Sequence, residues 1–161
     1  MPGKRIVNAS PLVFLAREDL LEMLPQGGYD VVVPEAVIDE IRAHGLADPT
    51  VLAIGRVSWL ATGPATPIPP EVECWDLGPG ESAVLALARA EPGAIVVIDD
   101  QGARRCARSL EIPLIGTLGL VLRAKKEGRI PEARPVVERL RGSGMYLSDQ
   151  VIKEALALVG E

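Results

Sequence analysis

The stretch GAIVVIDDQGARR, residues 93 to 105, runs an apolar segment directly into two carboxylates. Residues 95–98 are all apolar and β-branched, a pattern typical of a buried parallel strand. Asp99 and Asp100 follow at once. Either the strand reaches the surface here and one aspartate caps the next helix, or the pair points into a site that needs negative charge. The choice depends on whether other acidic residues reach the same place.

Short apolar strands alternate with helices along the whole chain. The pattern predicts an α/β sandwich with a mostly parallel sheet, formed by a single domain over residues 1–161. The segment 63–70 is rich in proline and reads as an extended linker. We expect strands at 4–7, 29–33, around 59–60, 95–98 and 112–116, and helices from Ser10 and at 18–24, 34–45, 78–90, 101–110, 117–128, 131–144 and 148–160.

Composition excludes several classes of protein. No apolar run approaches the roughly 18 residues of a membrane span, and the first residues are too weakly apolar for a secretory signal, so we expect a cytoplasmic protein. The net charge of −5 argues against a protein that coats nucleic acid without specificity. Cys74 and Cys106 lie far apart and are expected to be free thiols. With His44 as the single histidine, a serine or cysteine hydrolase is not supported.

Polar and acidic residues follow several of the expected strands. The ligand crevice of a parallel sheet lies at the carboxyl ends of its strands, so these side chains are expected to converge. Repelling carboxylates are stabilised by a cation, and oxygen ligands suit Mg²⁺ or Mn²⁺. A divalent ion held in this way can promote phosphodiester hydrolysis. The residues are Asn8, Ser10, Glu35, Asp39, Glu40, Glu81, Asp99 and Asp100.

Each of these residues also has a structural explanation. Glu35 and Asp39 fit a solvated helix face near a helix N-terminus, and Glu81 fits the first turn of its own helix. Asparagine suits turns, so Asn8 alone carries little information. One of the two adjacent aspartates is expected to cap the helix at 101–110.

Taken in order, five segments resemble the PIN-domain family: IVNASPLVFLA, VVVPEAVIDEI, DLGPGESAVLALA, the run from VIDDQGARR to KKEGRI, and GMYLSDQVIKEAL. More narrowly they resemble a prokaryotic subgroup that begins with N-x-S-P-L. The likeness covers nearly the whole chain, except for residues 44–70. The resemblance implies a three-layer α/β/α sandwich and a Mg²⁺- or Mn²⁺-dependent ribonuclease. The family also includes the toxin halves of toxin–antitoxin pairs, so the resemblance implies a possible toxin role as well.

The resemblance also implies a set of site residues. Glu40, Glu81, Asp99 and Asp100 match the acidic metal ligands of the family, and Ser10 matches its hydroxyl position. Asn8 stands where the first aspartate usually is, so one ligand contributes an oxygen without charge. On this reading Ser10 and Asn8 orient the attacking water. The substrate backbone would be steered by Arg104, Arg105 and Arg108, whose alternative role is a solvated helix face.

Two interpretations of this altered site stay open at the level of sequence. The first is an active nuclease that cleaves RNA and pairs with an antitoxin protein. The second is a catalytically weakened module of the same fold that binds protein or RNA. A receiver-like phosphoacceptor is disfavoured, because its acidic pair would follow the first strand. The apolar stripe of residues 151–159 predicts either a homodimer surface or packing on the chain's own core.

Overall fold

A computed structural model describes residues 3–161, and its centre is a five-stranded sheet in the order β3-β2-β1-β4-β5. All four strand pairs are parallel, so every connection crosses over from one end of the sheet to the other. The strands are β1 (Lys4–Val7), β2 (Asp30–Pro34), β3 (Leu60–Gly63), β4 (Ile95–Val97) and β5 (Leu114–Ile115).

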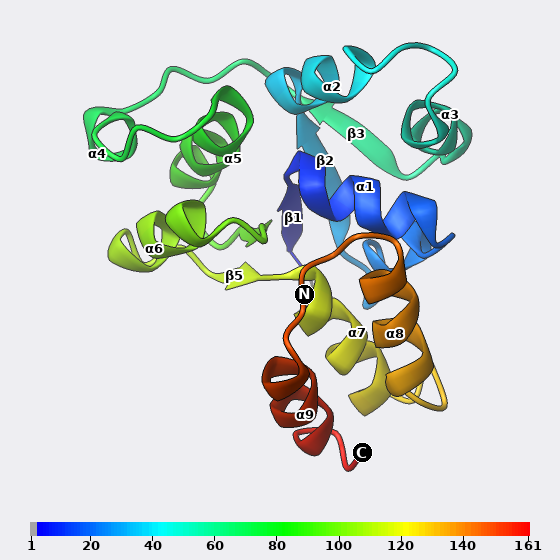
Figure 1. The fold of residues 1–161 in the computed structure, drawn as a ribbon. Coiled ribbons are helices and arrows are strands. Elements are labelled where there is room, and N and C mark those ends of the chain that lie inside the picture. The colour runs from blue at the N-terminus through cyan, green and yellow to red at the C-terminus, as the bar shows by residue number, and fades with distance from the viewer. Residues whose placement is uncertain (1–2) are drawn as a thin grey trace.

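Helices cover both faces of the sheet. From β1 through β2 to β3, successive strands are added toward one edge of the sheet, and from β3 through β4 to β5 the chain progresses toward the other edge. Right-handed crossovers place these two sets of connections on opposite faces of the sheet. In Figure 1, α5 and α6 lie on one side of β1 and α1 lies on the other. The predicted three-layer α/β/α sandwich is confirmed. The helices are α1 (Ala9–Arg17), α2 (Glu35–Arg42), α3 (Pro49–Arg56), α4 (Pro70–Glu73), α5 (Pro79–Ala90), α6 (Gln101–Ser109), α7 (Thr117–Lys126), α8 (Arg134–Gly142) and α9 (Asp149–Ala157).

The core lies between the sheet and these helices. Ile6, Val7, Val96 and Val97 on the two central strands are fully buried, as expected for strands that are covered on both faces. Helix α5 buries most of its length between β4 and α2, as its nearly continuous apolar sequence predicts. Strand burial and sequence pattern therefore agree in the centre of the molecule.

Three sequence predictions are corrected at their boundaries. The first helix begins at Ala9 rather than after Ser10, so Asn8 takes the N-cap position. The predicted helix at 18–24 is only a 3₁₀ turn, Leu21–Met23, which ends just before Pro25 because proline breaks helical hydrogen bonding. The linker after Gly63 is extended as predicted, but it ends in α4, a single turn that the proline-rich sequence concealed.

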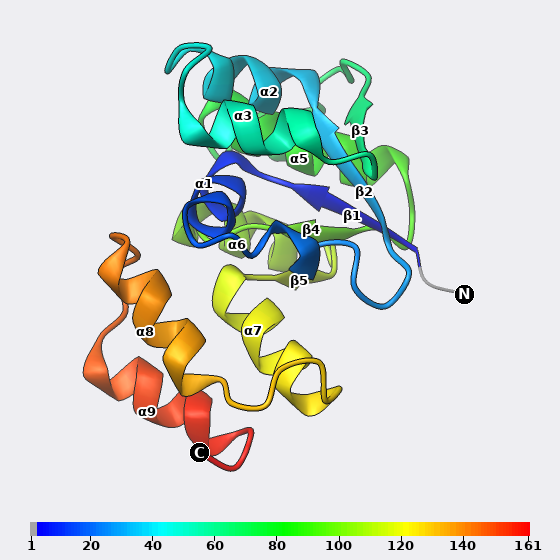
Figure 2. The same ribbon diagram turned by 90° about the vertical axis from the view of Figure 1, so that its right-hand side faces the viewer.

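The last three helices form a separate group beside β5. Figure 2 shows α8 and α9 packed next to α7, away from the other edge strand. The stripe on α9 largely covers the chain's own core, since Ile152, Ala155 and Leu156 are buried. Val151 and Leu158 remain exposed. Within residues 3–161, no helix has the length and apolarity to cross a membrane.

Candidate active site

The candidate site lies at the carboxyl ends of β1 and β4. The strand that follows β1 in the chain lies on one side of this pair, and the strand that follows β4 lies on the other side. The position between β1 and β4 is therefore the topological switch point of the sheet. Ligands of open α/β sheets bind in the crevice at such a point. Asn8 follows β1, and its backbone N–H donates to the carbonyl of Val97 on β4 at 3.1 Å. The sheet therefore brings the NAS and IDD segments together, as predicted.

Asn8 does not behave as an ordinary helix cap. An N-cap asparagine normally accepts a hydrogen bond from the first turn of its helix, but the Asn8 side chain makes no capping bond. The residue is 2% exposed, and its Oδ1 has no hydrogen-bond partner in the described chain. A buried acceptor without a donor is costly, so this carbonyl oxygen is available to a ligand.

Glu40 reaches the same place from α2. A Cβ on Gly80 would sit 2.6 Å from Glu40 Oε2 and 3.2 Å from Asn8 Oδ1. The two oxygens thus face one small space, which exists because residue 80 has no side chain. Gly80 was not among the predicted site residues, although its position between Pro79 and Glu81 at the start of α5 was a usable signal.

Glu81 is a second carboxylate in the neighbourhood of Glu40. The pKa of Glu40 is raised, first because the carboxyl group is partly desolvated and second because it feels the negative charge of Glu81. The charge of His44 acts weakly in the opposite direction. Glu81 turns back over Gly78, where a Cβ would lie 2.6 Å from its Oε2. The two glutamates therefore form a like-charge pair that a cation would stabilise.

Asp99 has a structural role in the described chain. Its Oδ1 accepts the backbone N–H of Thr117 at 2.8 Å, and its Oδ2 accepts the Thr117 hydroxyl at 2.7 Å. Thr117 is fully buried and is the first residue of α7. Asp99 thereby fixes the start of α7 to the end of β4, a function that the sequence did not reveal.

Asp100 is the N-cap of α6. Its Oδ2 accepts the backbone N–H of Ala103 at 2.9 Å, so the expectation that one aspartate of the pair caps this helix is confirmed. The carboxylate is nevertheless exposed. It can therefore interact with a ligand while it stabilises the helix.

A groove of about 920 Å³ extends from this acidic end toward the C-terminal helices. Ser10, Glu81, Asp99, Asp100 and Arg104 line its polar end. The Arg104 guanidinium is half-buried and donates to the carbonyl of Ile98 at 3.1 Å. Burial and the charge of Arg108 lower the pKa of Arg104.

Arg105 and Arg108 are exposed on α6. Among the three predicted substrate-binding arginines, only Arg104 lines the groove.

The acidic residues do not close into a full metal cage. Across the described part of the chain, no three histidine, cysteine, aspartate or glutamate side chains come together as metal ligands. The oxygens that share one space are those of Glu40 and Asn8, and the negative charge of Glu81 acts on Glu40 from nearby. Cys74 and Cys106 are free thiols, as expected from their spacing.

Comparison with known proteins supports the fold and the family. Residues 4–161 match the model of a family described as a PIN domain. No curated protein matches the chain. Nine chains of solved structures match, among them the "Structure of the PIN domain endonuclease Utp24", with a TM-score of 0.54 and 14% sequence identity over 70% of this chain and 84% of that one. At this identity the likeness shows a shared fold.

Proposed function

The chain belongs to the PIN-domain family, and from this premise we propose that it is a ribonuclease that hydrolyses RNA phosphodiesters with Mg²⁺ or Mn²⁺. The observation that carries the proposal is the buried Asn8 Oδ1, which has no partner and shares the space beside Gly80 with Glu40 Oε2. An oxygen acceptor that is left unsatisfied at the switch point of the sheet fits a site that is completed by a ligand.

The residues present fit a hard divalent cation. Asn8, Glu40 and Glu81 would hold it, since amide and carboxylate oxygens are the ligands that Mg²⁺ and Mn²⁺ prefer. Asp100, and Asp99 through its remaining lone pairs, would contribute from the end of β4. When bound, such an ion lowers the pKa of an attacking water and stabilises charge on the phosphoryl oxygens.

The protein groups around this position would bind and orient the substrate. Arg104 is held against the end of β4 by Ile98, and its guanidinium can donate to a phosphate oxygen. Ser10 is exposed on the first turn of α1 and lines the same groove, so its hydroxyl can orient a water toward the phosphorus atom. Arg105 and Arg108 add positive charge along α6 for the flanking phosphates.

Calorimetric titration with Mn²⁺ tests the metal site. Gly80→Ala places a Cβ within 2.6 Å of Glu40 Oε2, so this flexible carboxylate must move, and we expect at least about a tenfold loss of affinity. Gly55→Ala is the matched control, because Gly55 lies in α3 and a Cβ there meets nothing within 4 Å. Glu81→Gln removes one charged ligand and should weaken binding similarly.

The results separate an active site from an inactive one. Saturable Mn²⁺ binding that Gly80→Ala and Glu81→Gln both weaken, followed by metal-dependent cleavage of RNA, would support the proposal. Absence of any heat of binding at millimolar Mn²⁺ would refute it.

A catalytically weakened module that binds protein or RNA is the second candidate. It is favoured by the lack, among residues 3–161, of three clustered metal-binding carboxylate, thiol or imidazole groups. It is favoured also by the hydrogen bonds that occupy Asp99 and Asp100. It predicts RNA binding without cleavage in Mg²⁺ or Mn²⁺.

Protein partners form a further part of the proposal. Tyr146, Val151 and Leu158 are exposed and line the groove beside the acidic end, and such apolar side chains fit either a homodimer or an antitoxin. Light scattering on the purified protein tests the homodimer, since a monomeric mass would exclude it. The toxin role and the cytoplasmic location stay predictions.

A further inference from the structure

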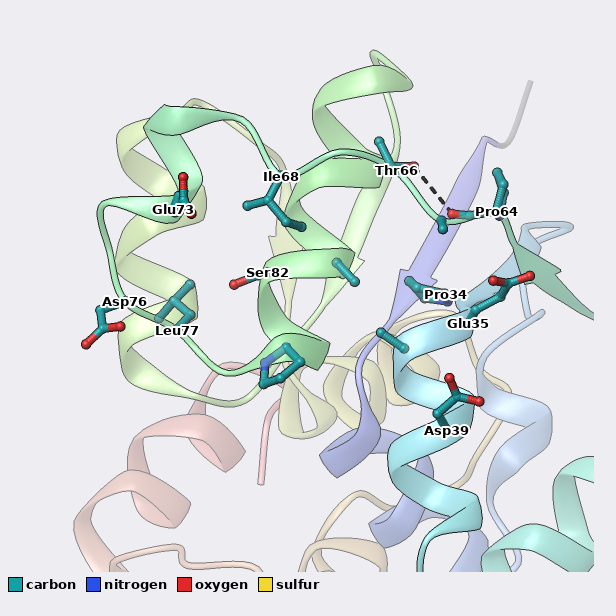
Figure 3. Close-up of a pocket in the computed structure, with 14 residues that line it drawn as sticks. Pro34, Glu35, Asp39, Pro64, Thr66, Ile68, Glu73, Asp76, Leu77 and Ser82 are labelled. Carbon is teal, nitrogen blue, oxygen red and sulfur yellow. Dashed lines mark hydrogen bonds between the residues drawn. The ribbon is translucent and has the colours of Figure 1, made fainter.

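A second cavity, of about 550 Å³, lies between α2, α5 and the segment that joins β3 to α5. Figure 3 shows it bounded on one side by Pro34 and on the other by Leu77, with Ile68 reaching over it from the linker. Pro64 and Pro79 complete an apolar lining. Its size is in the range of small-ligand sites. The linker 64–69, which had no assigned role in the sequence, forms one wall.

The rim of this cavity carries charge of one sign. Its four charged lining residues are Glu35, Asp39, Glu73 and Asp76, and no lysine, arginine or histidine lines it. All four are exposed. The seven ion pairs of the described chain involve other carboxylates. A cleft with low-dielectric walls and one sign of charge concentrates ions of the opposite sign.

Ser82 points to a ligand independently of the acidic rim. The residue is 9% exposed and lines the cavity. Its hydroxyl points into the open space (Figure 3) and stays accessible to solvent or to a ligand. The cavity therefore offers an acceptor, an apolar lining and negative charge at its mouth.

We propose that this cavity binds an alkyl cation, that is, a primary ammonium or guanidinium group on an aliphatic stem. The stem would lie on Pro34, Ile68 and Leu77, and the cationic group would interact with Asp39 and Ser82. An RNA phosphate would be repelled by the rim. The site is thus distinct from the proposed nuclease centre and does not depend on its activity.

The two sites share helices but use different faces of them. Successive residues of an α-helix are turned by about 100°. On α2, Asp39 lines the cavity while Glu40 faces Asn8, and on α5, Ser82 lines the cavity while Glu81 lines the long groove. This arrangement allows one site to be altered without removing a side chain of the other.

Titration of the full chain by ¹H–¹⁵N NMR, with divalent metal chelated, tests the proposal. The probes are 1,5-diaminopentane and N-acetyl-lysine methylamide, with pentane-1,5-diol as an uncharged control of equal length. We expect saturable shifts with both cations, in the millimolar range, at the amides of Ala65, Thr66, Ile68, Asp76, Leu77, Gly78, Ser82 and Ala83. Tighter binding of the diamine would indicate a free polyamine, and tighter binding of the lysine analogue would indicate a protein side chain.

Variants place the binding site. Asp39→Asn and Ser82→Ala should each weaken binding by about threefold, as expected for loss of an exposed charge or one hydrogen bond, while Glu138→Gln, an exposed position on α8, should leave it unchanged. Equal shifts with the diol, no saturable shifts around the cavity, or unaltered binding by both cavity variants would each overturn the proposal.

Discussion

The two ends of the central sheet surround their buried polar side chains differently. At the carboxyl end, Asn8 Oδ1 has no partner, and Glu40 and Glu81 repel each other. At the amino end, Arg5 is 2% exposed, yet its Nη1 donates to the carbonyls of Met23, Leu24 and Gln26 at 3.2, 2.8 and 3.2 Å. Its guanidinium also stacks over the Tyr29 ring at 4.0 Å, while its buried Nε has no hydrogen-bond partner in the described chain.

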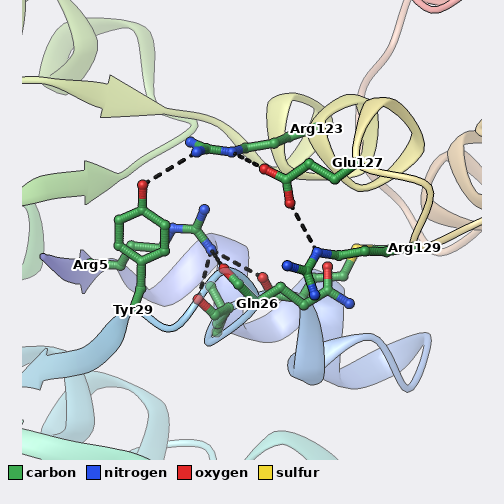
Figure 4. A network of polar contacts seen from close by, with 8 residues as sticks. Arg5, Gln26, Tyr29, Arg123, Glu127 and Arg129 are labelled. Atoms are coloured by element: carbon green, nitrogen blue, oxygen red, sulfur yellow. Dashed lines mark hydrogen bonds and ion pairs between the residues drawn. The ribbon is translucent and has the colours of Figure 1, made fainter. Parts of the chain in front are cut away.

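The amino-end contacts continue outward as a network. Figure 4 shows Arg123 and Arg129 on either side of Glu127, with Arg123 also reaching the Tyr29 hydroxyl. Opposite charges alternate there, whereas like charges gather at the carboxyl end. The comparison teaches that burial alone does not mark a functional site. A single unpaired atom does not mark a site either, because Arg5 Nε is unpaired in a group whose Nη1 makes three bonds. What distinguishes Asn8 Oδ1 is that Glu40 Oε2 lies beside the same small space.

The largest expected effect is on catalysis at the carboxyl end. Asp100→Asn should lower RNA cleavage by at least about 100-fold, because it removes a proposed ligand charge. Asparagine caps helices as well as aspartate does, so the Ala103 bond and the melting temperature should be retained. Cleavage that survives in this variant at the wild-type rate would remove the metal role of Asp100.

At the amino end the largest effect should be on stability. Arg5→Met leaves three carbonyls without this donor and Tyr29 without its cation, and we expect the free energy of unfolding to fall by roughly 3 kcal/mol. Urea denaturation measures this change. Arg129→Met, which breaks one exposed ion pair with Glu127, should cost less than about 1 kcal/mol. If the Arg5→Met variant folded but no longer bound Mn²⁺, the amino end of the sheet would affect the proposed metal site at the carboxyl end, and the two ends would not act independently.

Thr117→Val tests whether Asp99, at the carboxyl end, contributes to stability or to metal binding. It removes the hydroxyl that donates to Asp99 Oδ2 and keeps the side-chain shape, so we expect a loss of about 1 to 2 kcal/mol in the free energy of unfolding. Metal affinity should stay close to wild type, since Asp99 acts mainly as the support of α7. Thr66→Val is a suitable control, because the Thr66 hydroxyl makes only a long bond of 3.4 Å to Pro64.

The smallest effect concerns pH at the amino end. Hydrogen bonds from Arg123 and then from Arg129 lower the pKa of Glu127 below its ordinary value of 4.5. The unfolded chain therefore takes up this proton at higher pH than the folded chain does. The stabilisation is complete above 4.5 and is lost as the pH falls through the lowered pKa. Urea unfolding of Glu127→Gln across this range should show a weaker pH dependence than wild type; an identical profile would contradict the assignment.

Sequence reasoning was reliable where local pattern and burial coincide. The β-branched runs predicted β1, β2 and β4, and the helices at 78–90 and 101–110 formed within one residue of their expected ends. It failed at 18–24, where an amphipathic segment is only a 3₁₀ turn before Pro25. It also missed α4, since four residues leave no detectable period.

Local pattern was enough to predict the α/β fold, the parallel sheet and the position of Asn8, Asp99 and Asp100 just after strands, because strand periodicity and helix start signals are read over a few residues. The order of the strands, and the partner that each polar side chain meets at their ends, came from the folded chain. It engaged Asp99 with Thr117, left Asn8 Oδ1 unpaired beside Gly80, and buried Arg5 among carbonyls. These roles depend on partners 18 or more residues away, and no local pattern encodes which partner a polar side chain will meet.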